Sequence, residues 1–265
     1  MMDNNSINVK NKYLILYVAH FINDFSLSQY YKLKNELPDG YDIVWWLDDN
    51  CRDNLIDGIK FVKFPHNSII NNSSTISPTR YFENIFLNIN DYKNYKYYWF
   101  IEYDNYYNGN WKTFFNDVDN NCNADLVCTN FKHIKKECVN KSDWFWKRNA
   151  TYEQYSSILS LYRLSNIAME TIAKYNQDDL KSYIYELYVP TIIYNNNLTF
   201  ANLNNNNQTF NMDEETKDYF NYFSNDGLGY IDSKKDFWWN VTFYDKNEMT
   251  KPNKLYTRYK PNKYW

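Results

Sequence analysis

Apolar residues in the first half of the chain fall into short, mostly continuous runs, which predicts strands that are buried on both faces of a sheet. Such runs are typical of parallel sheets, because helices cover both of their faces. The predicted strands are Tyr13–Ala19, Tyr41–Leu47, Ile59–Phe64, Tyr97–Ile101 and Asp125–Thr129.

Between these runs, apolar residues recur at helical spacing. Ser26–Leu37 has this spacing and stops at a Pro-Asp-Gly turn. Ser77-Pro78 is a capping residue followed by proline, which predicts a helix over Thr79–Leu87, and a further helix is expected to start at Trp111. The polar stretches Asn67–Ser77 and Asn116–Asn123 are expected to be loops. Alternating strands and helices predict an α/β fold, with a mostly parallel sheet and helices on both faces.

The second half of the chain is less regular. Its predicted elements are a strand over Ser156–Tyr162, a helix over Asn166–Tyr175 capped by Ser165, a helix over Leu180–Tyr194 interrupted by Pro190, and a strand over Leu198–Leu203. Asn204–Asp213 is polar and of low complexity, which is typical of a linker, and the tail after Phe237 shows few clear elements.

Two carboxylates follow the most apolar strand. Tyr97–Ile101 leads directly into Glu102-Tyr103-Asp104. In an extended chain both acids share one face, about 7 Å apart, and a slight bend aims both at one divalent cation. Oxygen ligands of this kind suit Mg²⁺ or Mn²⁺. The alternative is a pair of solvated acids that end a strand.

Composition excludes several functions. A net charge of −3 and a pI near 5.7 argue against a nucleic-acid partner, which needs a concentrated basic surface. With 5 glycines the chain has no glycine-rich phosphate loop, which disfavours kinases, P-loop enzymes and ordinary dinucleotide-binding dehydrogenases. It also has no Gly-x-Ser-x-Gly motif of serine hydrolases.

The chain also lacks targeting signals. Its N-terminus is polar, and no stretch approaches the about 20 apolar residues of a membrane span. The four cysteines show no paired spacing and are expected to be free. We therefore expect a cytoplasmic protein.

The segment Trp99–Asp104 resembles the acid-x-acid motif of GT-A-type nucleotide-sugar glycosyltransferases, with Glu102 in place of the first Asp. In that superfamily the motif follows a buried strand and holds Mn²⁺ or Mg²⁺ against the donor diphosphate. The resemblance implies a single GT-A-like domain. Its nucleotide-sugar-binding half, which is Rossmann-like, would span about 12–130, its acceptor half about 131–203 and an irregular tail 204–265.

The resemblance also implies roles for single residues. Glu102 and Asp104 would hold the metal. Donor contacts would come from strand ends and the helix before the metal strand, with Arg80 on the diphosphate: Val18, His20, Asp48, Asp49, Arg80 and Tyr103. Each of these positions is also compatible with an ordinary polar or packed residue.

Glu186 is the candidate general base. It is a single acid among apolar and aromatic residues, so it is either exposed or a buried carboxyl with a raised pKa. The buried form suits removal of a proton from an acceptor hydroxyl. In a retaining enzyme it would only orient the acceptor.

The remaining candidates are open. His133 is expected on the surface after a strand, so a third metal ligand is missing or is one of Asp232, Asp236 and Asp245. Trp144–Trp146 suits sugar stacking or core packing equally.

The function expected is sugar transfer from a nucleotide sugar, taken to be a UDP-sugar, to a hydroxyl of a glycan, a protein or a small molecule. The alternatives are a non-catalytic carbohydrate-binding protein on the same fold, and a metal-dependent phosphotransfer enzyme or nuclease.

Overall fold

The computed structural model describes residues 12–19, 21–48, 56–64, 92, 94–134, 154–174, 185–203, 209–210 and 255–256. Its strands are β1 (Tyr13–Ala19), β2 (Tyr41–Asp48), β3 (Phe61–Phe64), β4 (Tyr97–Glu102), β5 (Tyr106–Tyr107), β6 (Leu126–Ile134), β7 (Gln154–Ser165), β8 (Phe200–Asn202), β9 (Thr209–Phe210) and β10 (Leu255–Tyr256). Its helices are α1 (Asp24–Asn35), α3 (Trp111–Asn121), α4 (Asn166–Lys174) and α5 (Tyr185–Asn195).

The central sheet has 8 strands in the order β3-β2-β1-β4-β7-β6-β8-β9. The pairs β2–β3, β1–β2, β1–β4 and β6–β8 are parallel, whereas β7 runs antiparallel to both β4 and β6. A mostly parallel sheet flanked by helices was predicted, and this fold class is confirmed. The reversed strand β7 in its middle was not predicted.

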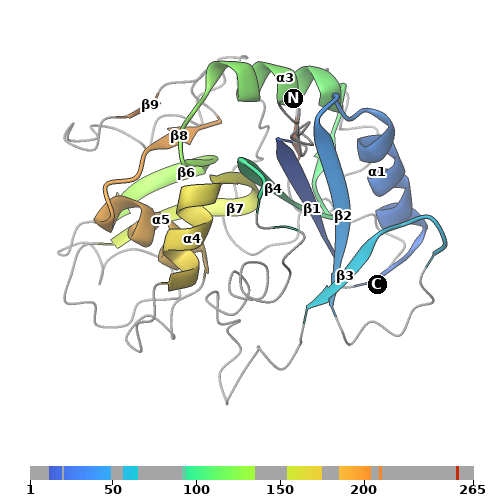
Figure 1. Ribbon diagram of the computed structural model, residues 1–265, viewed down its shortest axis with the longest axis horizontal. Coiled ribbons are helices and arrows are strands. Elements are labelled where there is room, and N and C mark those ends of the chain that lie inside the picture. Colours follow the sequence, from blue (N-terminus) through green and yellow to red (C-terminus); the bar gives the residue numbers. More distant parts are fainter. Residues whose placement is uncertain are drawn as a thin grey trace, which may run out of the picture.

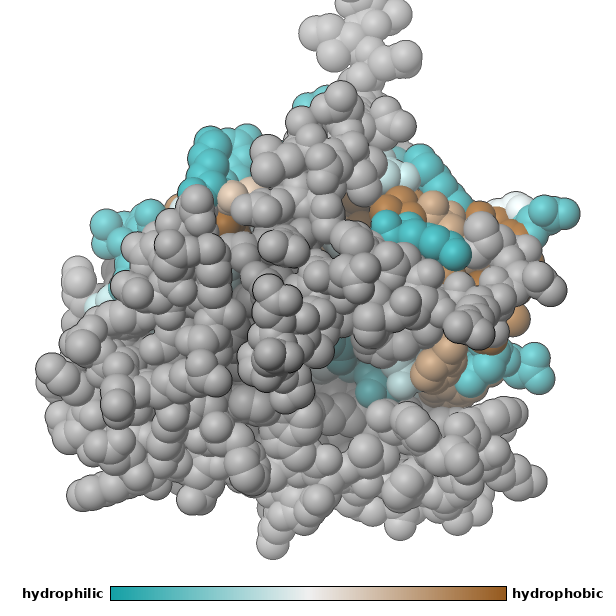
Figure 2. All heavy atoms as spheres, turned by 90° about the horizontal axis from the view of Figure 1, so that it is seen from below, coloured by the Kyte–Doolittle hydropathy of each residue, from teal (hydrophilic) through white to brown (hydrophobic). Residues whose placement is uncertain are grey.

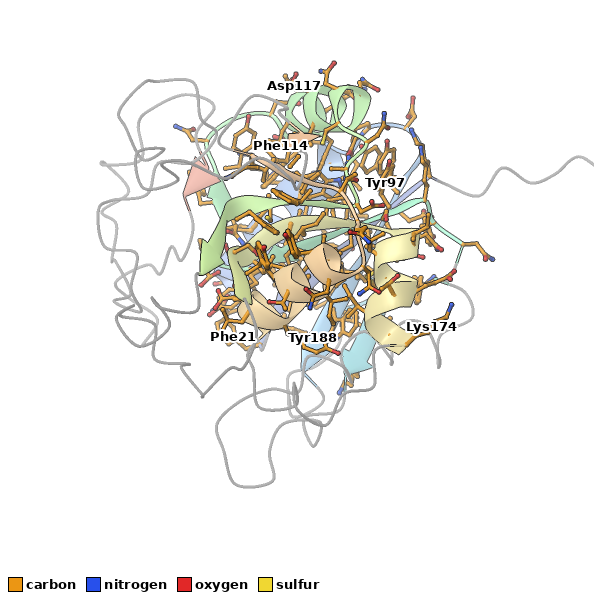
Figure 3. The ribbon with its side chains drawn as sticks, turned by 90° about the vertical axis from the view of Figure 1, so that its left-hand side faces the viewer. Phe21, Tyr97, Phe114, Asp117, Lys174 and Tyr188 are labelled. Atoms are coloured by element: carbon orange, nitrogen blue, oxygen red, sulfur yellow. The ribbon has the colours of Figure 1, made fainter. Side chains whose placement is uncertain are left out.

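Helices cover both faces of the sheet and make a three-layer molecule (Figure 1). Residues of α4 and α5 share a hydrophobic core with alternate residues of β1, including Leu14 and Leu16. Residues of α1 and α3 share a second core with the intervening residues of β1, including Ile15 and Tyr17. Figure 3 shows the same division, with Phe114 and Asp117 of α3 on one side of the sheet and Tyr188 of α5 on the other. Strand β1 is buried along its whole length because both of its faces are covered.

The polar stretch predicted as a loop over Asn116–Asn123 is instead helical as far as Asn121. Its asparagines are exposed, whereas Val118 and Asp119 on the same segment are buried. The polar residues are therefore one face of α3 rather than a connection. The expected loop over Asn67–Ser77 and the helix over Thr79–Leu87 lie outside the described residues.

Three further expectations need correction. Strands β6 and β7 are longer than predicted, and His133 lies within β6, where it pairs with Tyr155, rather than after the strand. Helix α5 continues through Pro190. Because proline has no N–H, residue 190 donates no hydrogen bond to the carbonyl of Glu186, and Pro190 itself is buried.

The predicted linker and tail contribute two short strands. Thr209–Phe210, within the expected linker, is β9 and pairs with β8 at the edge of the sheet. Leu255–Tyr256, within the tail, is β10 and pairs antiparallel with β5. The prediction of Ser165 as the cap of α4 is confirmed, because its hydroxyl accepts a hydrogen bond from the N–H of Ala168 at 3.1 Å.

A buried ion pair joins α3 to strand β7. Arg163 is completely buried, and its guanidinium binds the carboxylate of Asp119, which is also buried. Arg163 donates further hydrogen bonds to the carbonyls of Cys122 (2.8 Å) and Ala124 (3.2 Å). The same carboxylate accepts hydrogen bonds from the indole of Trp99 at 3.0 Å and from the hydroxyl of Tyr41. One carboxylate thus connects α3, β7, β4 and β2.

We expect Asp119→Asn to lower the free energy of unfolding by about 3–5 kcal/mol, because it leaves the Arg163 charge buried without its partner. Urea unfolding followed by circular dichroism measures this change. Glu170→Gln is the matched control, because Glu170 pairs with Lys174 on the exposed surface of α4 and its loss should cost at most about 0.5 kcal/mol. Equal effects of the two substitutions would contradict this role of Asp119.

Candidate functional site

The order of the strands reverses between β1 and β4. The chain moves outward from β1 through β2 to β3, and then returns to the other side of β1 with β4. In open α/β sheets, ligands bind at the carboxyl ends of the strands beside such a reversal, since a crevice opens there. Val18 near the end of β1 pairs with Glu102 at the end of β4. Glu102, Tyr103 and Asp104 therefore lie at the point of the sheet where a ligand site is expected.

The two acids are held in a reverse turn rather than in an extended strand. Strand β4 ends at Glu102, and the N–H of Asn105 donates to the carbonyl of Glu102 at 3.0 Å, so that Tyr103 and Asp104 are the central residues of a turn. The N–H of Tyr103 donates to the carbonyl of Val18 at 2.9 Å and ties the turn to β1. The expectation that an extended chain presents both acids on one face is therefore wrong, because the chain turns directly after Glu102.

The carboxylates differ in their surroundings. Glu102 is partly exposed, and by strand alternation it follows Phe100 on the face that α5 covers. Asp104 is only 7% exposed. Burial raises the pKa of Tyr17 well above its usual value, and the Asp104 carboxylate raises it further. Burial likewise raises the pKa of Tyr103, with Asp104 and then Glu102 adding to the effect. Both phenols therefore stay neutral beside the acids at ordinary pH.

Asn105 fixes the turn to the neighbouring strand. Its side-chain amide N–H₂ donates to the carbonyl of Glu102 at 2.9 Å and to the carbonyl of Ser160 on β7 at 2.7 Å. Asn105 is 2% exposed, and among the described residues its amide oxygen accepts no hydrogen bond. Asn105 thus belongs to the site, although the sequence did not single it out. The available signal was an asparagine directly after the acid-x-acid segment, since asparagine favours turns through its own side-chain hydrogen bonds.

The segment after the turn is held by helix α1. Lys32 donates from its ammonium group to the carbonyl of Tyr107 at 2.5 Å, and Glu36 accepts a hydrogen bond from the N–H of Trp111 at 2.8 Å. Burial lowers the pKa of Lys32, and the Glu36 carboxylate partly offsets that effect. The two side chains position β5 and the start of α3, and β10 from the distant tail pairs with β5 at the same place.

Gly109 fits under the ring of Tyr107. A Cβ at position 109 would lie 2.5 Å from the Cζ atom of Tyr107. That ring is 1% exposed and packs against Trp111 and Phe114, at centroid distances of 4.9 and 5.5 Å. The turn from β5 to α3 therefore requires glycine at this position.

The other residues predicted for donor binding are placed only in part. The side chain of Val18 is buried in the core shared with α4 and α5, and its carbonyl already accepts the hydrogen bond from Tyr103. Asp48 is the last residue of β2, which places its backbone at the same edge of the sheet. Residues predicted for the site or its border that lie outside the described residues are His20, Asp49, Arg80, Trp144–Trp146, Asp232, Asp236 and Asp245.

Glu186 is another buried carboxyl among the described residues. It lies in the first turn of α5 and is 7% exposed, which excludes the exposed position considered from the sequence. Helix α5 is attached to β7 through Thr191, whose hydroxyl bonds the backbone N–H and carbonyl of Tyr155 at 3.0 and 3.2 Å. Glu102 and Glu186 therefore belong to the same face of the sheet.

Within the described part of the chain, no group of three or more His, Cys, Asp and Glu side chains could hold a metal ion. The donors at the turn are two carboxylates and the amide oxygen of Asn105, which receives no hydrogen bond from the described residues. Hard oxygen donors of this kind match the preferences of Mn²⁺ and Mg²⁺, which are often bound through one or two carboxylates together with substrate phosphates. The residues present therefore fit such a cation.

Among the described helices, none is both long enough and apolar enough to cross a bilayer. In the view of Figure 2, hydrophilic and hydrophobic described residues lie side by side at the surface.

Comparison with known proteins finds likeness in structure only. No protein-family model and no curated protein matches the chain. A putative glucose-1-phosphate thymidylyltransferase from Bacillus anthracis is 11% identical, with a TM-score of 0.43, over 75% of this chain and 87% of that one. The galactosyltransferase LgtC, solved with donor and acceptor sugar analogues, is 11% identical, with a TM-score of 0.38, over 68% and 69%. Core-mannan synthase A from Aspergillus fumigatus, in its Mn/GDP form, is 12% identical, with a TM-score of 0.39, over 71% of each chain. Identities and TM-scores this low carry no function from those proteins to this chain.

We expect Gly109→Ala to destabilise the protein by about 1–3 kcal/mol, because the new methyl group overlaps the buried Tyr107 ring. Thermal and urea unfolding measure the change. Lys112→Ala, three residues along on the exposed face of α3, is the control and should change stability by at most about 0.5 kcal/mol. If Gly109→Ala is as stable as this control, the close packing of Tyr107 is not required.

Proposed function

We propose that this protein is a glycosyltransferase that moves a sugar from a nucleotide-sugar donor to a hydroxyl acceptor. Glu102 and Asp104 hold a divalent cation, Mn²⁺ or Mg²⁺, against the donor diphosphate. The cation, when bound, acts as a Lewis acid that stabilises the negative charge on the departing nucleoside diphosphate.

The observation that carries the proposal is the position of the acid turn. Glu102–Asn105 closes a turn at the carboxyl end of β4, beside β1, where the strand order reverses. Ligands of open α/β sheets bind at such a position. Carboxylates placed there suit the binding of a phosphate-bearing ligand through a cation, since they cannot bind phosphate directly.

The residues of the turn face different layers of the molecule. Tyr103 is packed edge-on against Phe21 at a centroid distance of 4.7 Å and belongs to the core shared with α1 and α3. Its backbone is bound to β1, so it keeps the acids on either side in place. Glu102 faces the α5 layer, where an acceptor and the base are proposed to lie.

Glu186 is the proposed general base. It is 7% exposed and lies in the first turn of α5, on the face of the sheet to which Glu102 also belongs. In this proposal it takes the proton of the acceptor hydroxyl as the oxygen attacks the sugar carbon, and the bond from that carbon to the diphosphate breaks. The proton remains on Glu186 until the product leaves.

We expect Asp104→Asn to weaken Mn²⁺-dependent binding of the donor by about tenfold or more, because the amide removes the negative charge from a metal ligand. Isothermal titration of UDP-sugars and GDP-sugars, with Mn²⁺ or with a chelator, measures the change. Asp39→Asn is the control, because Asp39 is an exposed carboxylate in the turn before β2, at the opposite edge of the sheet. Unchanged metal-dependent donor binding in Asp104→Asn sinks the proposed metal centre.

We expect Glu186→Gln to lower kcat for sugar transfer by about 10²–10⁴-fold while the donor affinity changes little, because the amide cannot accept the proton. Transfer to a panel of hydroxyl acceptors, followed by release of the nucleoside diphosphate, is the measurement. Glu170→Gln on the exposed face of α4 is the matched control. A kcat close to that of the unmodified protein would assign Glu186 to packing.

A further inference from the structure

The side-chain amide of Asn105 has only one possible orientation. Its N–H₂ group lies 2.9 Å from the carbonyl oxygen of Glu102 and 2.7 Å from that of Ser160. Exchanging the amide nitrogen and oxygen would set an oxygen against two carbonyl oxygens, which repel it. The hydrogen bonds therefore fix the direction of the Asn105 amide oxygen as well.

That oxygen is buried and accepts no hydrogen bond from the described residues. Leaving a buried amide oxygen without a partner costs about 1–3 kcal/mol, so such groups in folded proteins usually meet a water, an ion or a ligand. The hydroxyl of Ser160 on β7, in a residue that is 3% exposed, is in the same situation. The structure thus leaves two buried polar oxygens, those of the Asn105 amide and the Ser160 hydroxyl, without a hydrogen-bond partner among the described residues.

The turn sets Asn105 beside the two acids. Its N–H closes the hydrogen bond to the carbonyl of Glu102, and the ends of such a turn lie within about 7 Å of each other. Asp104 is the adjacent residue. An amide oxygen is a neutral, hard donor of the kind that Mg²⁺, Mn²⁺ and Ca²⁺ accept next to carboxylates. It adds an oxygen ligand without adding another negative charge that would have to be buried.

We propose that Asn105 is a third protein ligand of the divalent cation and supplies its amide oxygen alongside the carboxylates of Glu102 and Asp104; this rests on the proposed metal centre. Asn105 then has two roles, one for the nitrogen and one for the oxygen of its side-chain amide. The N–H₂ group holds the turn against β7, and the oxygen binds the cation. The site thereby gains a third protein oxygen from within the turn itself, where neither a histidine nor a third acid stands among the described residues.

The test is the affinity of the full chain for Mn²⁺, measured by titration calorimetry and by the electron paramagnetic resonance signal of free Mn²⁺, alone and with saturating UDP. Asn105→Ala removes both roles and should weaken binding about tenfold or more. Asn105→Asp loses the hydrogen bonds to both carbonyls, but it keeps an oxygen ligand and adds a negative charge that attracts the cation, so it should retain an affinity within about threefold of the unmodified chain. Asn166→Ala is the control, because Asn166 donates to the carbonyl of Tyr95 at 3.1 Å near the other end of β4, and its loss should leave the affinity unchanged.

The outcomes separate the possibilities. Equal losses in Asn105→Ala and Asn105→Asp would make Asn105 a residue that only positions the turn and overturn the ligand role. An unchanged affinity in Asn105→Ala, with a loss in Asp104→Asn, would leave the proposed metal centre standing and assign the amide oxygen to a buried water. No Mn²⁺ binding by the unmodified chain, with or without UDP, would overturn the metal centre itself. Circular dichroism of each metal-free variant verifies folding, and Asn105→Ser replaces Asn105→Ala in the comparison if the alanine variant does not fold.

Discussion

The buried pair of Arg163 and Asp119 is the interaction on which the arrangement of the sheet depends. Arg163 lies on β7, the strand that runs against its neighbours, and Asp119 lies on the buried face of α3. A charge in this position would be very costly without its partner, so the packing of β7, β4 and α3 must satisfy both groups at once. The guanidinium also lies over the ring of Tyr97, 4.2 Å from its centroid, at the first residue of β4. The pair therefore fixes β4 between β1 and β7 from its amino end.

A fixed β4 gives the acid turn at its other end a defined place. The backbone of Tyr103 is bound to β1, and the side chain of Asn105 is bound to β7, so the turn is attached to the strands on both sides of β4. Lys32 and Glu36 hold the chain that follows. Functional side chains keep a fixed arrangement only where the backbone that carries them is rigid. These attachments supply that rigidity, which a site on a free loop would lack.

Local sequence patterns correctly predicted the features that depend on neighbouring residues alone. The bounds of β1 follow from seven successive buried residues, and the cap of α4 follows from the hydroxyl of Ser165. The patterns failed where distant contacts decide. The asparagines of α3 resemble a loop until the other face of the helix is seen to be buried. The residues Leu255–Tyr256 alone do not predict a strand, because that strand forms through its pairing with β5. The placement of the acids at the end of β4 was predictable, whereas the turn that holds them depends on Asn105 reaching β7, which no spacing along the chain reveals.

Carboxylates lie near both ends of β4, in different settings. Near the amino end, Asp119 pairs with the buried guanidinium of Arg163 and accepts hydrogen bonds from Trp99 and Tyr41, so its charge is balanced within the protein. Near the carboxyl end, Glu102 is partly exposed, and the two phenols that sense Asp104 have pKa values raised by burial and by its charge. Neutral phenols can donate hydrogen bonds but cannot neutralise a carboxylate. The carboxyl end of β4, which lies at the reversal of the strand order, is thus the end where a ligand of the sheet is expected to bind.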